Sequence, residues 1–109
     1  MENNNNLVWE SISFKEPQLT IRGNYIYFNS AMRDILKDSD NNGLDFFRTE
    51  IDGKLVLSCK SGNQFIFAKK KNESRIICND LANYIVSNYN NKNHFTLVLI
   101  DGFYMLRSE

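Results

Sequence analysis

Residues 19–36, LTIRGNYIYFNSAMRDIL, decide the fold of this chain because two different periodicities meet in them. The first half contains two runs of β-branched and aromatic residues, LTI and YIYF, which are typical of strands. Gly23 and Asn24 stand between these runs, and both tolerate the positive φ that a tight turn demands. The stretch therefore begins with a β-hairpin.

The second half of the stretch has the spacing of a short helix. Asn29 or Ser30 is placed to cap the free N–H groups at its start. One face carries four apolar residues, Ala31, Met32, Ile35 and Leu36. Another hairpin follows, because FFRTEI and KLVLSC flank the turn-forming pair Asp52-Gly53. Residues 18–60 are thus predicted to form a hairpin, a short helix and a hairpin.

The same order of elements recurs in residues 64–109. QFIFA and RIICN flank the basic connection KKKNES, Asn79 caps a stretch with helical spacing, and FTLVLI and FYMLRS flank Asp101-Gly102. The apolar face of this predicted helix consists of Leu81, Ala82, Ile85 and Val86. Overlaying the two segments at offsets of 50 and 49 residues matches Ile26 with Ile76, Asn29 with Asn79, Ile35 with Ile85, Ile51-Asp52-Gly53 with Ile100-Asp101-Gly102, and Leu57 with Leu106.

We interpret the two segments as half-units of an internal duplication. Neither half-unit is able to bury its sheet face alone, so the pair is expected to share one core about a pseudo-twofold axis. The prediction is an α+β chain with one β-barrel-like domain over residues 17–109. Residues 1–16 are predicted to be a flexible tail, with an added edge strand as an alternative. A coincidental match is the competing interpretation, because any α+β chain contains hairpins and helices.

The opening stretch, followed by a strand, an Asp-Gly turn and another strand, resembles the AbrB/MazE type of swapped-hairpin DNA-binding domain. In that family two hairpins are linked by a short helix, and two chains interlace into one barrel. The resemblance covers residues 18–60 and, more weakly, 64–109, so one chain would supply both halves, as in tandem members. The chain departs from the family pattern where GNYIYFN lacks the usual proline before the helix. The resemblance implies a DNA-binding transcriptional regulator.

The resemblance also indicates basic residues as the DNA contacts. The first half keeps mainly Arg22, while the second offers Lys69, Lys70, Lys71 and Arg75. Ammonium and guanidinium groups at these positions would meet phosphates and give salt-dependent affinity with little sequence preference. The competing interpretation is a solvated hairpin tip, where lysine and polar residues normally gather.

Composition favours a second class of function as the alternative. Thirteen basic residues balance thirteen acidic ones among 109 residues, so the chain as a whole has no long-range attraction to nucleic acid. Four aromatic residues flank the predicted turns: Tyr25, Tyr27, Phe103 and Tyr104. Aromatic side chains are enriched at interface hot spots, although cross-strand pairing is their commoner role. The alternative is a protein-binding inhibitor or accessory factor from a phage or other mobile element, for example an anti-defence protein acting on a host nuclease.

Hydropathy and cysteine usage predict a small globular protein of the cytoplasm. No apolar run approaches the ~18 residues that span a bilayer, and MENNNN lacks the basic start and apolar stretch of a signal peptide. We expect no membrane association and either a monomer or a homodimer. Cys59 and Cys78 lack C-x-x-C spacing and are expected to be buried free thiols.

Residues 37–50, KDSDNNGLDFFRTE, are the strongest candidate for a chemical site because they resemble a calcium loop. The twelfth loop position, which must hold a bidentate glutamate, is Thr49, and Glu50 comes one place too late. The stretch is therefore interpreted as a polar helix-to-strand connection. His94 stands alone in a predicted loop, and the sequence has no phosphate loop or nucleophile elbow. We expect no enzyme activity, no cofactor and no metal.

Overall fold

One antiparallel sheet forms most of the described part of this computed structural model, which comprises residues 7–9, 16–68 and 75–108. Its strands are β1 (Gln18–Arg22), β2 (Tyr25–Phe28), β3 (Gly43–Ile51), β4 (Lys54–Gly62), β5 (Phe65–Ile66), β6 (Arg75–Ile77), β7 (His94–Ile100) and β8 (Phe103–Ser108). The same residues contain two helices, α1 (Ser30–Leu36) and α2 (Asn79–Asn88). Strands and helices follow one another in the predicted order, but β5 and β6, which were predicted to form one hairpin, pair with β3 and β2 instead.

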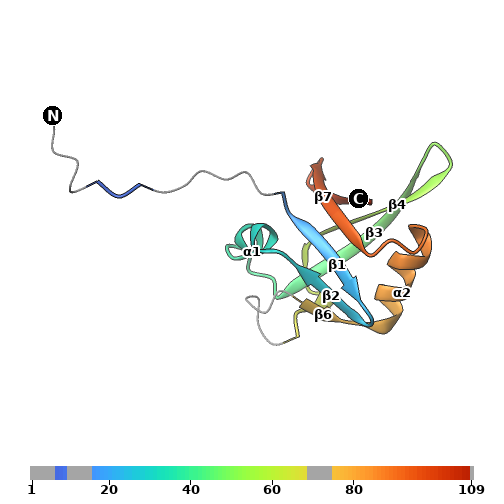
Figure 1. The fold of residues 1–109 in the computed structure, drawn as a ribbon, viewed down its shortest axis with the longest axis horizontal. Coiled ribbons are helices and arrows are strands. Elements are labelled where there is room, and N and C mark those ends of the chain that lie inside the picture. The colour runs from blue at the N-terminus through green and yellow to red at the C-terminus, as the bar shows by residue number, and fades with distance from the viewer. Residues whose placement is uncertain (1–6, 10–15, 69–74, 109) are drawn as a thin grey trace.

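The sheet curls into a nearly closed barrel, with α1 and α2 at opposite sides of it in Figure 1. Its strand order is β5-β3-β4-β8-β7-β1-β2-β6, and each pairing between described strands is antiparallel. The two ends of this order are also linked. The N–H of Ala68, just after β5, donates to the carbonyl oxygen of Arg75 at the start of β6 (2.9 Å). The barrel-like α+β fold expected from the sequence is confirmed at this level.

All three predicted two-residue turns are present. Gly23 has a φ of 61° in the β1–β2 turn, where the missing Cβ removes the steric penalty of this conformation. Asp52 and Gly53 have φ values of 53° and 79°, and Asp101 and Gly102 have values of 52° and 86°. Two positive φ angles in succession define the type I′ turn that matches the twist of a hairpin. These turns fix the registers of β3 with β4 and of β7 with β8.

The two helices begin in different ways. Asn29 caps α1 as predicted, because its Oδ1 accepts from the N–H of Met32 (3.1 Å). The prediction that Asn79 caps α2 is wrong: the cap is Cys78, and its side chain makes no capping hydrogen bond. The physical reason is a contact with the β1–β2 turn, since Cys78 N–H donates to the carbonyl of Asn24 (2.9 Å) and holds Cys78 extended. Within the described residues, neither helix is long and apolar enough to cross a membrane.

Both helices contribute to the core that fills the barrel. The buried helix residues are Met32, Leu36, Leu81, Ala82 and Ile85, and they pack with inward-facing strand residues such as Leu19, Ile26, Leu44, Ile76, Phe95 and Leu106. The predicted apolar face of α1 is only partly correct, because Ile35 is 41% exposed. In α1 the buried residues are Met32 and Leu36, four positions apart on one face, and Ile35 lies beside that face.

A tyrosine hydroxyl is inserted in the seam between β4 and β8. The register pairs Ser58 with Met105 and Cys59 with Tyr104. One residue further on, the N–H of Leu57 donates to the Oη of Tyr89 (3.0 Å), which in turn donates to the carbonyl of Leu106 (3.1 Å). The phenol thus bridges the two strands where their direct ladder stops.

The calcium-like stretch is a polar connection between α1 and β3. The hydroxyls of Ser39 and Ser61 are hydrogen-bonded to each other, and Asn41 Nδ2 donates to Ser61 Oγ (2.8 Å). The side-chain amide of Asn63 donates to Asn41 Oδ1 (2.8 Å) and accepts from the N–H of Asn42 (2.9 Å). Strand β3 begins directly after Asn42, where a calcium-binding loop would continue toward a second helix. These side chains therefore join the α1–β3 connection to the β4–β5 turn.

The chain before β1 is described at residues 7–9 and from residue 16 onward. Residues 7–9 are exposed and belong to no strand. The rest of the segment for which an edge strand was the alternative, residues 10–14, lies outside the described residues.

Candidate functional site

The outer face of β1, β2 and β6 carries the predicted contact residues that the structure describes. Side chains alternate between the two faces of a strand, and Leu19, Ile21, Ile26 and Ile76 are buried on the inner face. The side chains at the intervening positions point outward: Gln18, Thr20, Arg22, Tyr25, Tyr27, Arg75 and Ile77. Among the described residues, these outward positions of the three strands hold two arginines and no carboxylate.

Four of these side chains form what we call the tyrosine–arginine face: Arg22, Tyr25, Tyr27 and Arg75. Strand register places Arg22 opposite Tyr25 and Arg75 opposite Tyr27. Each guanidinium then leans diagonally, with Arg22 Cζ 5.8 Å from the centroid of the Tyr27 ring and Arg75 Cζ 5.6 Å from that of Tyr25. The two tyrosine centroids are 5.8 Å apart. Cation–π attraction of this kind holds both guanidinium groups over the sheet.

This face brings together two arginines that the sequence indicated only as separate candidate DNA contacts. Arg22 and Arg75 belong to different predicted half-units and meet because β2 pairs with β6. Lys69, Lys70 and Lys71 lie outside the described residues, in the connection that leads into Arg75. The association of both arginines with the tyrosines was not predicted, although the alternation of Tyr25 and Tyr27 about a buried Ile26 would indicate that both rings share the outer face.

His94 continues the outer surface toward β7. The prediction placed it in a loop, whereas the structure has it as the first residue of β7, paired with Thr20 of β1. Its Nδ1 is 2.8 Å from Thr20 Oγ1, and the residue is half-buried. The loop assignment is wrong because pairing with β1 extends the strand by one residue beyond the apolar run.

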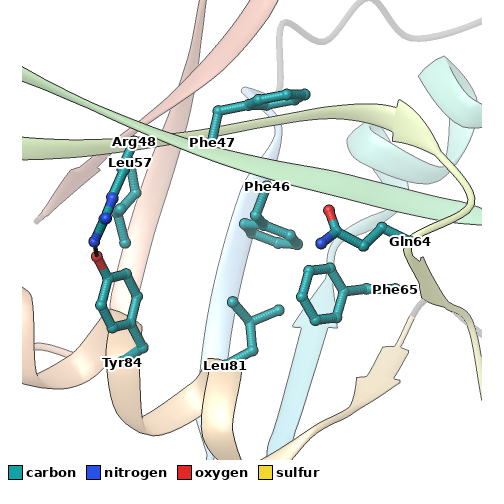
Figure 2. Close-up of a pocket in the computed structure, with 8 residues that line it drawn as sticks. All are labelled: Phe46, Phe47, Arg48, Leu57, Gln64, Phe65, Leu81 and Tyr84. Carbon is teal, nitrogen blue, oxygen red and sulfur yellow. Dashed lines mark hydrogen bonds between the residues drawn. The ribbon is translucent and has the colours of Figure 1, made fainter.

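A cleft of about 290 Å³ lies between β3 and α2 (Figure 2). Its floor is apolar, with Phe46 and Phe65 in edge-to-face contact (centroids 5.6 Å apart). One end is closed by Arg48, whose Nη1 donates to Tyr84 Oη (2.9 Å), and this hydrogen bond raises the pKa of the guanidinium further. In Figure 2 Arg48 and Tyr84 reach toward each other from β3 and α2. The lining of this cleft contains no nucleophile and base in contact.

A second concavity, the apolar groove, lies on the outer face of β3, β4, β7 and β8. Its volume is about 470 Å³, and its lining includes Phe47, Ile51, Ile100 and Phe103. Phe47 packs edge-to-face on Phe103 (5.1 Å), with Lys60 Nζ 5.4 Å and 4.7 Å from their respective centroids. Phe47, Ile51 and Ile100 are 38%, 48% and 46% exposed. The groove is therefore an apolar surface on the outside of the barrel, where polar side chains would be usual.

The described residues offer little for covalent or metal chemistry. Among them, no three His, Cys, Asp or Glu side chains gather in a way that could hold a metal ion. Both cysteines are free thiols; the burial predicted for Cys59 is confirmed, while Cys78 is half-buried at the start of α2. Burial raises the pKa of the Cys59 thiol to about 12, so it stays protonated and unreactive at neutral pH.

Comparison with known proteins assigns no relative, since no protein-family model, no curated protein and no solved structure matches the chain.

Proposed function

We propose that this chain is a small non-enzymatic DNA-binding protein, a transcriptional regulator of the AbrB/MazE-like type, that contacts DNA through the tyrosine–arginine face. The observation that carries the proposal is the convergence of an exposed Arg22 and a half-buried Arg75 on one outward face, whose positions in the three described strands hold no carboxylate. Arginine side chains on a sheet surface are well suited to phosphate oxygens, because their planar donor fork binds them in pairs.

The strand pairing supports two interlaced half-units. Exchanging β1–β4 with β5–β8 leaves the closed strand order unchanged. Ile26 pairs directly with Ile76, the residue that the sequence overlay matches to it. Two hydrogen bonds between the halves occupy matching places in this exchange of strands. Ile21 N–H of β1 donates to the carbonyl of Asn93 just before β7 (2.8 Å), and Phe67 N–H just after β5 donates to the carbonyl of Asn42 just before β3 (3.0 Å). Interlaced halves within one chain are what a tandem member of the swapped-hairpin family requires.

DNA binding is tested by the affinity for mixed-sequence DNA, in duplex and heat-denatured form, as a function of salt. The logarithm of the association constant should fall linearly with the logarithm of salt concentration. Arg22→Gln and Arg75→Gln should each make the slope shallower by about 1, because each removes one phosphate contact. Arg33→Gln is the matched control, since Arg33 is an exposed cation on α1 away from the face.

Failure of both DNA forms to bind at low salt would reject the proposal. An equal change of slope in all three variants would reject the assignment of the face. The contribution of Lys69, Lys70 and Lys71 is measured separately by replacing all three with alanine. A shallower slope would include them in the interface, and an unchanged slope would restrict it to the two arginines.

The apolar groove favours a second candidate function, in which the chain binds another protein as an inhibitor or accessory factor of a mobile element. Exposed apolar patches rimmed by polar residues mark protein contacts. A pull-down should then recover one stoichiometric protein that survives nuclease treatment. The double variant Phe47→Ser/Ile100→Ser should lose it, whereas Ile77→Ser, which removes an equally exposed apolar side chain from another face, should keep it. Recovery of nucleic acid alone would reject this function.

A further inference from the structure

We infer that the tyrosine–arginine face takes single-stranded nucleic acid in preference to a duplex. This inference rests on the proposed binding at the tyrosine–arginine face and specifies the form of the ligand. A preference for single-stranded DNA would keep the proposed DNA binding without the duplex mode of a transcriptional regulator, and a preference for RNA would replace DNA as the ligand. Two properties of the face lead to it: the width of the paired strands that surround the four residues, and the planar groups that they present.

The width of the surface opposes entry into a duplex groove. Strand β1 pairs with β7 on one side and β2 on the other, and β2 pairs with β6. Four paired strands at ~4.8 Å spacing separate the outer strand axes by about 14 Å before side chains are counted. The major groove of B-DNA is about 12 Å wide and admits a two-stranded ribbon. A duplex would therefore meet only the β1–β2 turn with its neighbours Arg22 and Tyr25, and Tyr27 and Arg75 would stay outside the groove.

The planar groups of the face match unpaired bases instead. Tyr25 and Tyr27 lie side by side on β2, the inner strand of the β1-β2-β6 surface, and Tyr25 is 37% exposed. The guanidinium groups of Arg22 and Arg75 reach over the rings of Tyr27 and Tyr25 from the flanking strands, so they present planar groups of their own on this face. Ile77, opposite Tyr25 in the register and 48% exposed, adds an apolar surface beside the ring. Bases stack on aromatic rings and on guanidinium planes without regard to sequence, while the arginine donors reach the phosphates.

The test compares three labelled probes of about 12 nucleotides, a length within the site sizes of single-strand platforms. The probes are a mixed-sequence DNA strand, the RNA strand of the same sequence, and the DNA strand annealed to its complement. Affinities are measured by fluorescence anisotropy at equal low salt. We expect the DNA or RNA single strand to bind at least about tenfold tighter than the duplex, and the ratio of the two single strands identifies which of them is the ligand.

Ring variants separate stacking from charge. Tyr25→Leu and Tyr27→Leu keep an apolar side chain on the sheet and should each weaken single-strand binding by about 5- to 150-fold, the range measured for loss of one stacking ring. Tyr25→Phe and Tyr27→Phe keep the ring and should bind within about twofold of the original protein. A thermal unfolding curve for each variant establishes that it is folded.

The outcomes distinguish this inference from the proposed function. Tighter binding of the duplex, with loss in Arg22→Gln, overturns the inference and leaves DNA binding intact. Leucine variants that bind single strands as well as the phenylalanine variants also overturn the inference. Failure of all three probes to bind overturns both.

Discussion

Removing one hydroxyl group, by Tyr89→Phe, should destabilise the barrel more than its small volume suggests. The Tyr89 Oη accepts from Leu57 N–H and donates to the Leu106 carbonyl, and both leucines are buried. The substitution leaves a donor on β4 and an acceptor on β8 without their partner. Each such hydrogen bond contributes about 0.5–1.5 kcal/mol net, and an unsatisfied buried group costs about 1–3 kcal/mol, so the expected loss is about 1–3 kcal/mol.

The loss is measured by urea unfolding, as a shift of the midpoint at unchanged slope. In a domain of this size a loss of 1 kcal/mol should also lower Tm by about 4–8 °C. Tyr104→Phe is the matched control, because Tyr104 is a partly buried tyrosine of β8 whose hydroxyl is not part of the bridge to Leu57 and Leu106. Its removal should change the free energy of unfolding by less than about 0.5 kcal/mol.

Equal stability of the two phenylalanine variants would refute the reasoning. It would mean that β4 and β8 close their ladder directly once the phenol is gone, so that Leu57 N–H finds the Leu106 carbonyl without help. A larger loss in Tyr104→Phe than in Tyr89→Phe would locate the important hydroxyl elsewhere in the seam.

Three substitutions and one pH effect test further contacts. Asn29→Ala removes the acceptor of the α1 cap and should lower the free energy of unfolding by about 1–2 kcal/mol in urea, whereas Asn29→Asp keeps that acceptor and should lose less. Gly43→Ala directs a Cβ against the backbone carbonyl of Phe65 and should cost about 1–3 kcal/mol; native-like stability would contradict that close approach. Cys78→Asp supplies the side-chain acceptor that α2 lacks at its N-cap and should raise the free energy of unfolding by about 0.5–1 kcal/mol. A fall in Tm would show that the carboxylate at this position does not cap the helix. Burial raises the pKa of the Tyr89 phenol above its value in the unfolded chain, which is about 10. As the pH rises through about 10, the phenol therefore deprotonates first in the unfolded chain. The difference in free energy of unfolding between the original protein and Tyr89→Phe should shrink only above that pH.

Turns were predictable because their requirements are local. A type I′ turn requires positive φ at two successive residues, and the Asp-Gly pairs that begin at Asp52 and Asp101 adopt these angles without help from distant residues. The start of α2 was not predictable in this way. Asn79 has the better capping side chain, yet the hydrogen bond from Cys78 to Asn24 in the β1–β2 turn decides where the extended chain stops. A tertiary hydrogen bond overrides a local preference at this helix and agrees with it at Asn29.

In the candidate site, too, local features were predictable from the sequence and contacts between distant segments were not. Arg22 and Arg75 were nominated from their charge, but their convergence depends on the pairing of β2 with β6, which joins segments far apart in the sequence. Tyr89 continues the apolar spacing of α2, four residues after Ile85, but this pattern does not predict its hydrogen bonds, because the bridge exists only once β4 and β8 lie side by side. Contacts that depend on which strands become neighbours are therefore the part that sequence patterns miss.

The outward aromatic residues are more informative about function than the buried ones. A barrel of this size must fill its interior, so Phe95 and Phe28 are explained by packing alone. Its outer positions carry no such demand, and a cross-strand aromatic pair there contributes only about 0.2–1 kcal/mol. Two separate outer surfaces nevertheless present aromatic rings with a cation over them, at Tyr25 and Tyr27 with the arginines and at Phe47 and Phe103 with Lys60. The first surface has two arginines, and the second has an apolar groove. The two surfaces should therefore bind different ligands. A substitution in one surface should leave ligand binding at the other surface unchanged.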